Sequence, residues 1–314
     1  MQADYRISVL IPCHSTNFLS ECIGSIQGQT ISKNAFEVVI VVDRVDQAAV
    51  TDILDDSDLN FRIISSGSPG IVPALNTGLE NIFSEYVARM DGDDLMFPDR
   101  LQAQLEYLEK TSICVAVGGQ LDLINEQGLH FGEIKFPNKV GTSSKELFLS
   151  SPVAHGGAMI RRRAISQIGG YRDFLAEDWD LWVRLRKIGE LHSLSQKVIE
   201  YRIHNNNSSR HDMFAKSHAR MIVAVSHFAR QENYADSPKS TSELEVWLTD
   251  AVKYLRKSSL EFRIFLRWAK RFDAYEKKFK SFATTRKIST GLALLTQYPI
   301  WFSREILKKV FTNR

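Results

Sequence analysis

Short apolar runs that recur along the first hundred residues most constrain the fold of this chain. Residues 7–12, 36–43, 61–64 and 86–90 are rich in valine and isoleucine and are too short for typical core helices. Near-continuous apolar runs of this kind are typical of parallel strands that are buried on both faces. Segments with helical spacing separate the runs, so the sequence predicts an α/β fold with a mainly parallel sheet flanked by helices.

Later segments extend this alternation. A helix is expected to start around Pro98, because proline is favoured in a first helical turn. Gly118 and Gly119 are expected to follow a strand, and the stretch from Asn125 to Gly128 suits a hairpin turn. The other predicted helices cover residues 18–29, 47–54, 72–83 and 176–185, and the other predicted strands cover residues 113–117, 158–160 and 198–204.

Three carboxylates follow the fourth apolar run within four positions. Asp91, Asp93 and Asp94 surround Gly92, and a glycine there lets the backbone turn and a ligand come close. Carboxylates packed this tightly raise one another's pKa and stay ionised readily only beside a cation. A hard divalent ion, Mg²⁺ or Mn²⁺, bound by one or two carboxylates and completed by phosphate oxygens, is the usual partner.

An acidic turn without a ligand is the plainer alternative, because aspartate and glycine are ordinary turn residues. Asp43 favours a functional site, since it ends the second predicted strand. The carboxyl ends of parallel strands form the edge at which open α/β sheets bind ligands. Asp43 and the three later aspartates are therefore expected to converge on one cleft.

A second acidic group opens a later helix. Glu177 and Asp178 precede Trp179, and Trp182 lies on the apolar face of the same helix. The helix dipole favours acids at this end, so capping explains one of them. Tryptophans also desolvate a neighbouring carboxylate, which makes it a stronger general base.

Two histidines lie at predicted strand ends. His204 ends the strand over residues 198–204 and would complete a metal site of mixed nitrogen and oxygen ligands, although a structural histidine is the simpler alternative. His155 lies in a loop with Gly156 and Gly157. Paired glycines permit close approach of the backbone to a sugar or to another strand.

Composition and charge narrow the class of protein. With 44% hydrophobic and 25% charged residues, the chain has the composition of a globular protein. Cys13, Cys22 and Cys114 are odd in number and lie in apolar surroundings, which predicts free thiols in a reducing cytosol. Neither a signal peptide nor a membrane-spanning helix is expected.

Positive charge gathers near the C-terminus, where residues 253–314 hold 16 Lys and Arg against four Asp and Glu. The predicted domains are a catalytic domain over residues 1–210 and a helical, basic region over residues 211–314. Basic amphipathic helices with aromatic residues suit an anionic membrane surface, and a helical cap with a solvated basic face is the alternative. No nucleic-acid-binding motif accompanies the charge, so nucleic acid is not an expected partner.

Together these motifs, over roughly residues 5–210, resemble the family 2 inverting glycosyltransferases, nucleotide-sugar-dependent enzymes of the GT-A fold. The strand ending at Pro12 looks like the family's Ser-Val-Ile-Ile-Pro start, and the strand ending at Asp43 is similar to its Asp-Asp-Gly-Ser strand. The Asn76–Thr77–Gly78 step looks like the family's Asn-x-Gly. The cluster at residues 91–94 resembles its Asp-x-Asp segment, residues 177–178 its Glu-Asp motif, and residues 201–204 its histidine segment.

The resemblance implies a role for each matching residue. Asp178 would be the catalytic base, and Asp93 and His204 would hold Mn²⁺ or Mg²⁺. The implied donor-binding residues are Pro12, Asp43, Asn76, Asp91 and Asp93. The implied acceptor contacts or supporting residues are Asp94, His155, Glu177, Trp179 and Trp182.

Two departures from the family pattern bear on the donor. Only one acid precedes Arg44, and the register of the strand places Asp43 on the second family aspartate, the one that recognises uracil. Leu75 stands where arginine is frequent, so one phosphate or ribose contact is missing. The nucleobase is therefore less well defined than the reaction.

The resemblance implies transfer of a hexosyl or N-acetylhexosaminyl group, with inversion, from a nucleotide-diphosphate sugar, with UDP as the expected nucleotide. The implied acceptor is a saccharide or a polyprenyl-linked glycan used for surface polysaccharide, at the cytoplasmic face of the membrane. One rival is a nucleotidyltransferase, which would show a glycine-rich phosphate loop where residues 13–17 lack one. The other is a degenerate, membrane-associated binding module.

Overall fold

The computed structural model describes residues 5–138, 151, 153–173, 177–204, 224–229, 231–234, 241–259 and 262–263. The chain divides into two compact units. The first comprises Met1–Val140, Ser151–Asp173 and Leu181–Asn205, and the second comprises Gly141–Ser150, Phe174–Asp180 and Asn206–Arg314. The predicted domain boundary after residue 210 lies outside the described residues and stays a prediction.

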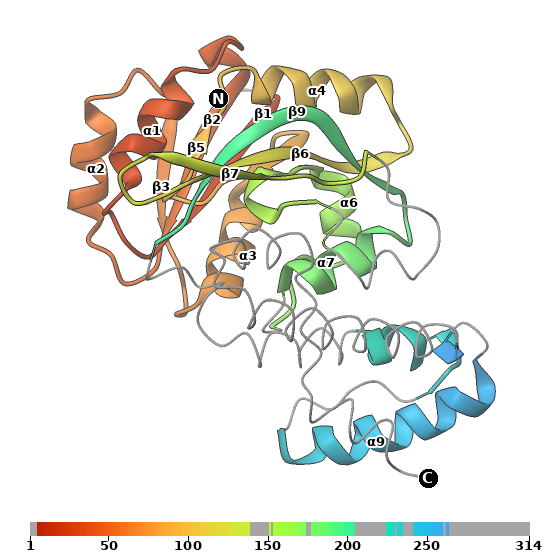
Figure 1. Ribbon diagram of the computed structural model, residues 1–314. Coiled ribbons are helices and arrows are strands. Elements are labelled where there is room, and N and C mark those ends of the chain that lie inside the picture. Colours follow the sequence, from red (N-terminus) through yellow and green to blue (C-terminus); the bar gives the residue numbers. More distant parts are fainter. Residues whose placement is uncertain are drawn as a thin grey trace, which may run out of the picture. The chain divides into compact units, whose positions relative to one another are not determined.

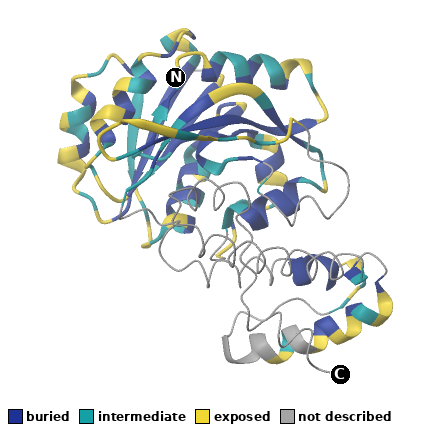
Figure 2. Cartoon of the chain, viewed as in Figure 1, coloured by how far each residue is buried: buried dark blue, intermediate teal, exposed yellow. Residues whose placement is uncertain are grey.

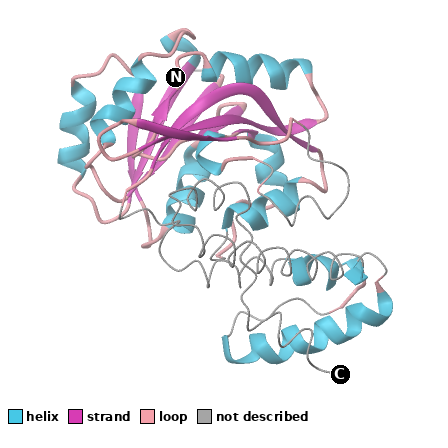
Figure 3. Cartoon of the chain, viewed as in Figure 1, coloured by secondary structure: helices cyan, strands magenta, loops and turns pink. Residues whose placement is uncertain are grey.

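A nine-stranded mixed sheet forms the centre of the first unit (Figures 1 and 3). Its order is β3-β2-β1-β4-β8-β6-β9-β5, and β7 pairs with β6. The strands are β1 (Ile7–Cys13), β2 (Phe36–Val42), β3 (Phe61–Ser65), β4 (Tyr86–Arg89), β5 (Leu95–Met96), β6 (Cys114–Ile124), β7 (His130–Ile134), β8 (Met159–Arg161) and β9 (Glu190–Arg202). The pairs of β1 with β2, β1 with β4 and β2 with β3 are parallel, which confirms the predicted parallel half.

Helices cover both faces of this parallel half. The first strand alternates its side chains, so Ile7, Val9 and Ile11 join one core cluster and Leu10 faces the other way. The cluster also receives apolar residues of α1 (Leu19–Gln27), α2 (Gln47–Asp55) and α4 (Arg100–Lys110). On the opposite face α3 (Ile71–Asn81) packs close, because a Cβ on its Gly78 would lie 2.3 Å from Leu10 Cδ1. The interior strands are accordingly buried (Figure 2).

The predicted strand end at Gly118 and Gly119 is wrong, because β6 continues through both glycines to Ile124. Close packing rather than a turn explains them. A Cβ on Gly118 would lie 2.5 Å from Val153 Cγ1, and a Cβ on Gly119 would lie 2.4 Å from Val198 Cγ1. The predicted hairpin does follow, as the antiparallel pair of β6 and β7.

Gly119→Ala is expected to destabilise the protein by about 1–3 kcal/mol, the usual cost of overpacking a core. The new methyl group would also meet the backbone oxygen of Gln196 at 2.7 Å, which cannot rotate away. Gly24→Ala is the matched control, because its Cβ meets nothing within 4 Å inside α1. That change should stabilise the protein by about 0.5–1 kcal/mol. Urea unfolding measures both, and a Gly119→Ala protein as stable as the parent would contradict the packing argument.

The second unit is helical where it is described. It contains α9 (Thr241–Ser258) and a helical segment at residues 224–229, both within the region over residues 211–314 that is predicted to be helical. Phe228 and Phe262 are buried with ring centroids 5.3 Å apart. Of the predicted membrane-contact region, residues 253–314, the described residues include only 253–259 and 262–263. Among the described helices, none combines the length and apolarity needed to span a bilayer.

Candidate active site

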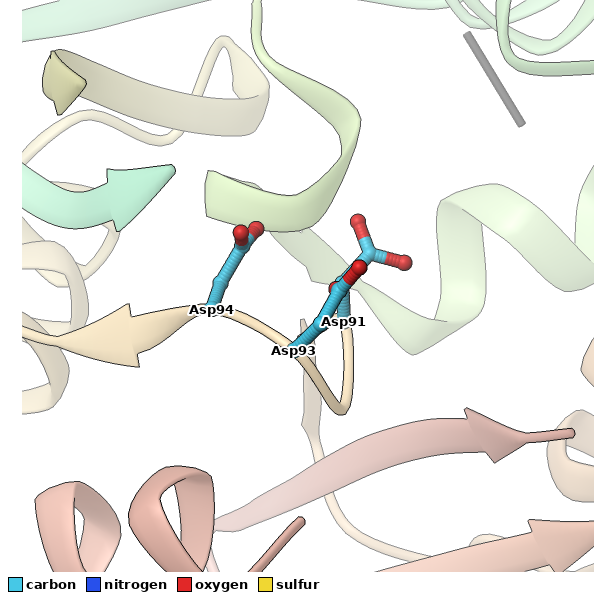
Figure 4. Close-up of side chains that lie close together, drawn as sticks. All are labelled: Asp91, Asp93 and Asp94. Atoms are coloured by element: carbon cyan, nitrogen blue, oxygen red, sulfur yellow. The ribbon is translucent and has the colours of Figure 1, made fainter. Parts of the chain in front are cut away.

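The three predicted aspartates extend from one turn between β4 and β5 (Figure 4). One ligand oxygen from each of Asp91, Asp93 and Asp94 lies within 4.8 Å of the other two. The turn begins at the carboxyl end of β4, which pairs in parallel with β1. The three acids therefore lie close together at that edge of the sheet, and their predicted convergence with Asp43 on one cleft stays a prediction.

Each carboxylate of the turn has a different protein partner. Asp91 forms an ion pair with the buried guanidinium of Arg89. Asp93 Oδ2 lies 2.8 Å from His204 Nε2. Asp94 Oδ1 accepts a hydrogen bond of 2.8 Å from the backbone N–H of Arg202. The protein itself thus supplies part of the positive charge that the sequence argument assigned to a metal ion alone.

The electrostatics still favour an added cation. Burial and the charge of Asp91 raise the pKa of Asp93. Burial, with the charges of Asp91 and Asp93, raises the pKa of Asp94 well above its usual range. Asp94 Oδ2 is buried without a hydrogen-bond partner among the described residues. Grouped carboxylate oxygens, one of them unpartnered, fit a hard divalent cation such as Mn²⁺ or Mg²⁺.

Two glycines border the acids, and only one is required there. Gly92 has an ordinary backbone conformation, and a Cβ on it would make ordinary contacts at 3.6 and 3.7 Å with Leu19 and Ile11. The backbone of the turn therefore does not use the conformational freedom of a glycine here, and the close approach of a ligand to Gly92 stays a prediction. A Cβ on Gly156 would instead lie 2.7 Å from Asp91 Oδ2 and 3.3 Å from Asp94 Oδ2, so the missing side chain there leaves room for the carboxylates.

His204 follows β9 and is held by an aromatic contact as well as by Asp93. Its ring centroid lies 5.3 Å from that of Phe18. Phe18 immediately precedes α1, so the first helix and the last strand of the sheet meet at the acidic turn. The pairing of His204 with Asp93 places the two predicted metal ligands together.

Asp43 lies directly after β2 and is well supplied with donors. Its Oδ2 accepts a hydrogen bond of 2.9 Å from the Gly70 backbone N–H, and Arg44 donates from Nε and Nη2 over 3.1 and 3.3 Å. Burial opposes ionisation, but these bonds outweigh it and lower the pKa of Asp43. Arg44 itself has a left-handed backbone with φ of 58°. Pro12 lies near the end of β1, which pairs with β2.

Asn76 ties two segments of the protein together. Its Nδ2 donates to the Tyr171 carbonyl and its Oδ1 accepts from the Tyr171 N–H, each over 2.9 Å. The Tyr171 hydroxyl in turn lies 2.8 Å from His155 Nε2, and burial lowers the pKa of His155 well below its usual range. Trp182 meets the His155 ring edge-on at 6.1 Å. Asn76 and His155 therefore both have structural partners. The predicted roles of Asn76 in binding the sugar donor and of His155 in contacting the acceptor stay predictions.

Asp178 lies in the first turn of α7 (Glu177–Leu185), as predicted. Its Oδ1 accepts a hydrogen bond of 2.8 Å from the Trp179 backbone N–H. Trp179 and Trp182 are fully buried. Glu177, Asp178 and Trp179 belong to the second compact unit, and their catalytic or supporting roles stay predictions.

The arginines that surround the acids were not predicted from the sequence. Arg89 and Arg202 contact them directly, and Arg100 donates to the Arg89 carbonyl over 2.7 Å. Burial lowers the pKa of Arg100 to about 9. A signal existed for Arg89, which lies two residues before Asp91 in an otherwise apolar strand. Residues two apart share a face of a strand, so the pair could have been predicted.

Comparison with known proteins agrees with this geometry. The family described as glycosyl transferase family 2 matches residues 8–169. The O-antigen biosynthesis glycosyltransferase WbnJ of Escherichia coli is 31% identical over 212 residues, which cover 65% of this chain and 82% of WbnJ.

Solved structures with low sequence identity show the same fold. The mannosyltransferase PcManGT from Pyrobaculum calidifontis, in complex with GDP-Man and Mn²⁺, aligns with a TM-score of 0.60 at 17% identity over 100% of this chain and 89% of its own. S. aureus TarS, in complex with UDP-GlcNAc, aligns with a TM-score of 0.57 at 16% identity over 79% and 71% of the two chains. The predicted GT-A fold is therefore confirmed.

Proposed function

Because this chain belongs to glycosyl transferase family 2 and is a glycosyltransferase of the GT-A fold, we propose that it is a metal-dependent, inverting enzyme. It transfers a sugar from a nucleotide-diphosphate donor to a saccharide or lipid-linked glycan during synthesis of a bacterial surface polysaccharide. The observation that carries the proposal is the convergence of Asp91, Asp93 and Asp94 at the carboxyl edge of the sheet. The similarity to WbnJ, an O-antigen biosynthesis glycosyltransferase, supports the proposal that the product is a surface polysaccharide.

The donor is proposed to bind along the carboxyl ends of β1, β2 and β4. Asp43 would accept the imide N–H of the base, and Asp91 would lie beside the ribose or sugar. The two similar structures hold UDP-GlcNAc and GDP-Man, and both uracil and guanine present such an N–H. A UDP-sugar remains the first choice, as the resemblance of Asp43 implies.

Asp93 and His204 are the proposed ligands of Mn²⁺ or Mg²⁺, with the diphosphate completing the site. When bound, such an ion neutralises the negative charge that develops on a leaving diphosphate. The supporting observations are the 2.8 Å contact between these two side chains and the unpartnered oxygen of Asp94. Asp94 is proposed to support the turn through its bond to Arg202.

Asp178 is the proposed general base. Its carboxylate would take the proton of an acceptor hydroxyl while that oxygen forms a bond to the anomeric carbon. The bond from the anomeric carbon to the diphosphate oxygen breaks on the opposite side, and its electron pair leaves with the nucleoside diphosphate. Attack opposite to the leaving group inverts the anomeric configuration, as a carboxylate base does in inverting glycosidases.

The test is release of nucleoside diphosphate from a panel of UDP-, GDP-, dTDP- and CDP-sugars with Mn²⁺ and the full chain. Slow hydrolysis of at least one donor is expected even without acceptor. Release of pyrophosphate from a sugar phosphate and a nucleoside triphosphate would instead favour the nucleotidyltransferase. No turnover with any donor, in spite of nucleotide binding, would favour a binding module.

Membrane attachment is a further part of the proposal. Sixteen basic residues between residues 253 and 314 would hold the enzyme at an anionic membrane surface. An acceptor carried on a polyprenyl lipid would then be presented at the cytoplasmic face.

A further inference from the structure

Arg202 contacts the acidic turn, α1 and the loop between β6 and β7. It is the last residue of β9, and its side chain is fully buried. The guanidinium donates from Nε to the Asp93 carbonyl over 2.9 Å and from Nη1 to the Glu126 carbonyl over 2.9 Å. Its Nη2 forms a 2.6 Å ion pair with Glu21 Oε2.

These contacts join four segments that are remote in sequence. Glu21 lies in α1, Asp93 in the acidic turn and Glu126 in the loop between β6 and β7. The backbone N–H of Arg202 reaches the same turn at Asp94 Oδ1. One residue thus holds both the main chain and a side chain of the acidic turn.

The same guanidinium also supports His204. It lies 4.5 Å from the centroid of the Phe18 ring, within the range of a cation–π contact. Phe18 in turn packs against the His204 ring. Arg202 therefore contacts one proposed metal ligand, Asp93, directly and supports the other, His204, through Phe18.

We propose that Arg202 is a positioning residue that sets the geometry of the cation site, and that Glu21 keeps its charge from opposing the cation. The inference rests on the proposed function, which assigns Asp93 and His204 to the metal. The Arg202 guanidinium donates to the backbone carbonyl of Asp93, while Asp93 Oδ2 lies against His204. Its positive charge is met by Glu21 instead, so the negative charge of the turn stays available to the ion.

Arginine suits this place because its planar group directs donors along several fixed directions. A lysine carries all its donors on one atom, so it cannot match acceptors that lie in several directions around the guanidinium. Arg202→Lys is therefore expected to raise the dissociation constant for Mn²⁺ by about 10–100-fold, the usual effect of losing a partner behind a metal ligand. Glu21→Gln should raise it by a smaller factor. Glu21 is 54% exposed, so this second change leaves the fold intact.

Arg161→Lys is the matched control. Arg161 is another buried arginine that donates to backbone carbonyls, among them that of Cys114 over 2.9 Å. It pairs with Tyr86 at the opposite end of β4 from the acidic turn. Its replacement should lower thermal stability as Arg202→Lys does, and leave the affinity for Mn²⁺ unchanged.

Free Mn²⁺ is measured by electron paramagnetic resonance during titration of each full-length variant with saturating UDP or GDP, and circular dichroism confirms folding. A folded Arg202→Lys protein that binds Mn²⁺ within about twofold of the parent would overturn the inference, because far larger losses follow removal of a positioning partner. An equal loss in Arg161→Lys would also overturn it. Where Arg202→Lys does not fold, an unchanged affinity in Glu21→Gln overturns it. A parent protein that binds no Mn²⁺ with either nucleotide would instead remove the metal site from the proposed function.

Discussion

Asp178→Asn is expected to lower the rate of sugar transfer by about 10²–10⁴-fold, the usual contribution of a general base. The amide keeps the size of the side chain and can still accept the hydrogen bond from the Trp179 N–H. It cannot accept the proton of an acceptor hydroxyl. The measurement is release of nucleoside diphosphate in the presence of acceptor, under saturating donor and Mn²⁺.

The binding of donor separates this effect from damage to the fold. Asp178→Asn should bind nucleoside diphosphate and Mn²⁺ as tightly as the parent, because the proposed donor site uses other residues. Glu177→Gln is the neighbouring control and should retain more of the activity, since Glu177 is expected to contact the acceptor or to support the site rather than to take a proton. Turnover near that of the parent in Asp178→Asn would remove this residue from the role of base.

The parallel half of the sheet was predictable because its strands are continuous apolar runs that no other element explains. The lengths of β1, β2 and β3 agree with the predicted strands to within one residue. The antiparallel half was less predictable. The ninth strand begins at Glu190, eight residues before the predicted start, because its middle carries the exposed polar stretch from Ser195 to Lys197. Periodicity cannot register a strand whose exposed part is uniformly polar.

The acids of the site were predictable and their partners were not. A cluster of aspartates is visible as sequence spacing, and strand ends bring such clusters to one edge of a sheet. The pairing of Arg202 with Glu21 joins residues 181 positions apart. No local pattern encodes that contact, and a single arginine in a strand does not name its partner.

Two matches to family motifs have structural explanations beside the functional ones. The side-chain amide of Asn76 forms hydrogen bonds with the Tyr171 backbone. The lack of a side chain at Gly78 lets Leu10 pack closely against α3. A residue type fixed by packing and one fixed by ligand contact look alike in a short motif. The surrounding hydrogen bonds distinguish them, and they favour anchoring of the loop at Tyr171 for Asn76.

Asp93→Ala is expected to abolish Mn²⁺-dependent binding of UDP or GDP, with a loss of affinity greater than about 100-fold. A partner behind a metal ligand is worth about 10–100-fold, and a direct ligand should be worth more. The change also removes the acceptor that His204 contacts at 2.8 Å, so both proposed ligands are lost to the ion. Isothermal titration calorimetry with nucleotide, with and without Mn²⁺, measures the effect.

Two variants sharpen the interpretation of that loss. Asp93→Asn keeps an oxygen for His204 but removes the charge, so an equal loss would assign the effect to charge rather than to the histidine contact. Asp122→Asn changes a largely buried aspartate on β6 that pairs with Lys197 over 2.6 Å, and it should leave the metal dependence unchanged. If Asp93→Ala binds nucleotide with undiminished Mn²⁺ dependence, the cation is held elsewhere. Asp91 and Asp94, each with an oxygen within 4.8 Å of an Asp93 oxygen, would then become the proposed ligands of the cation.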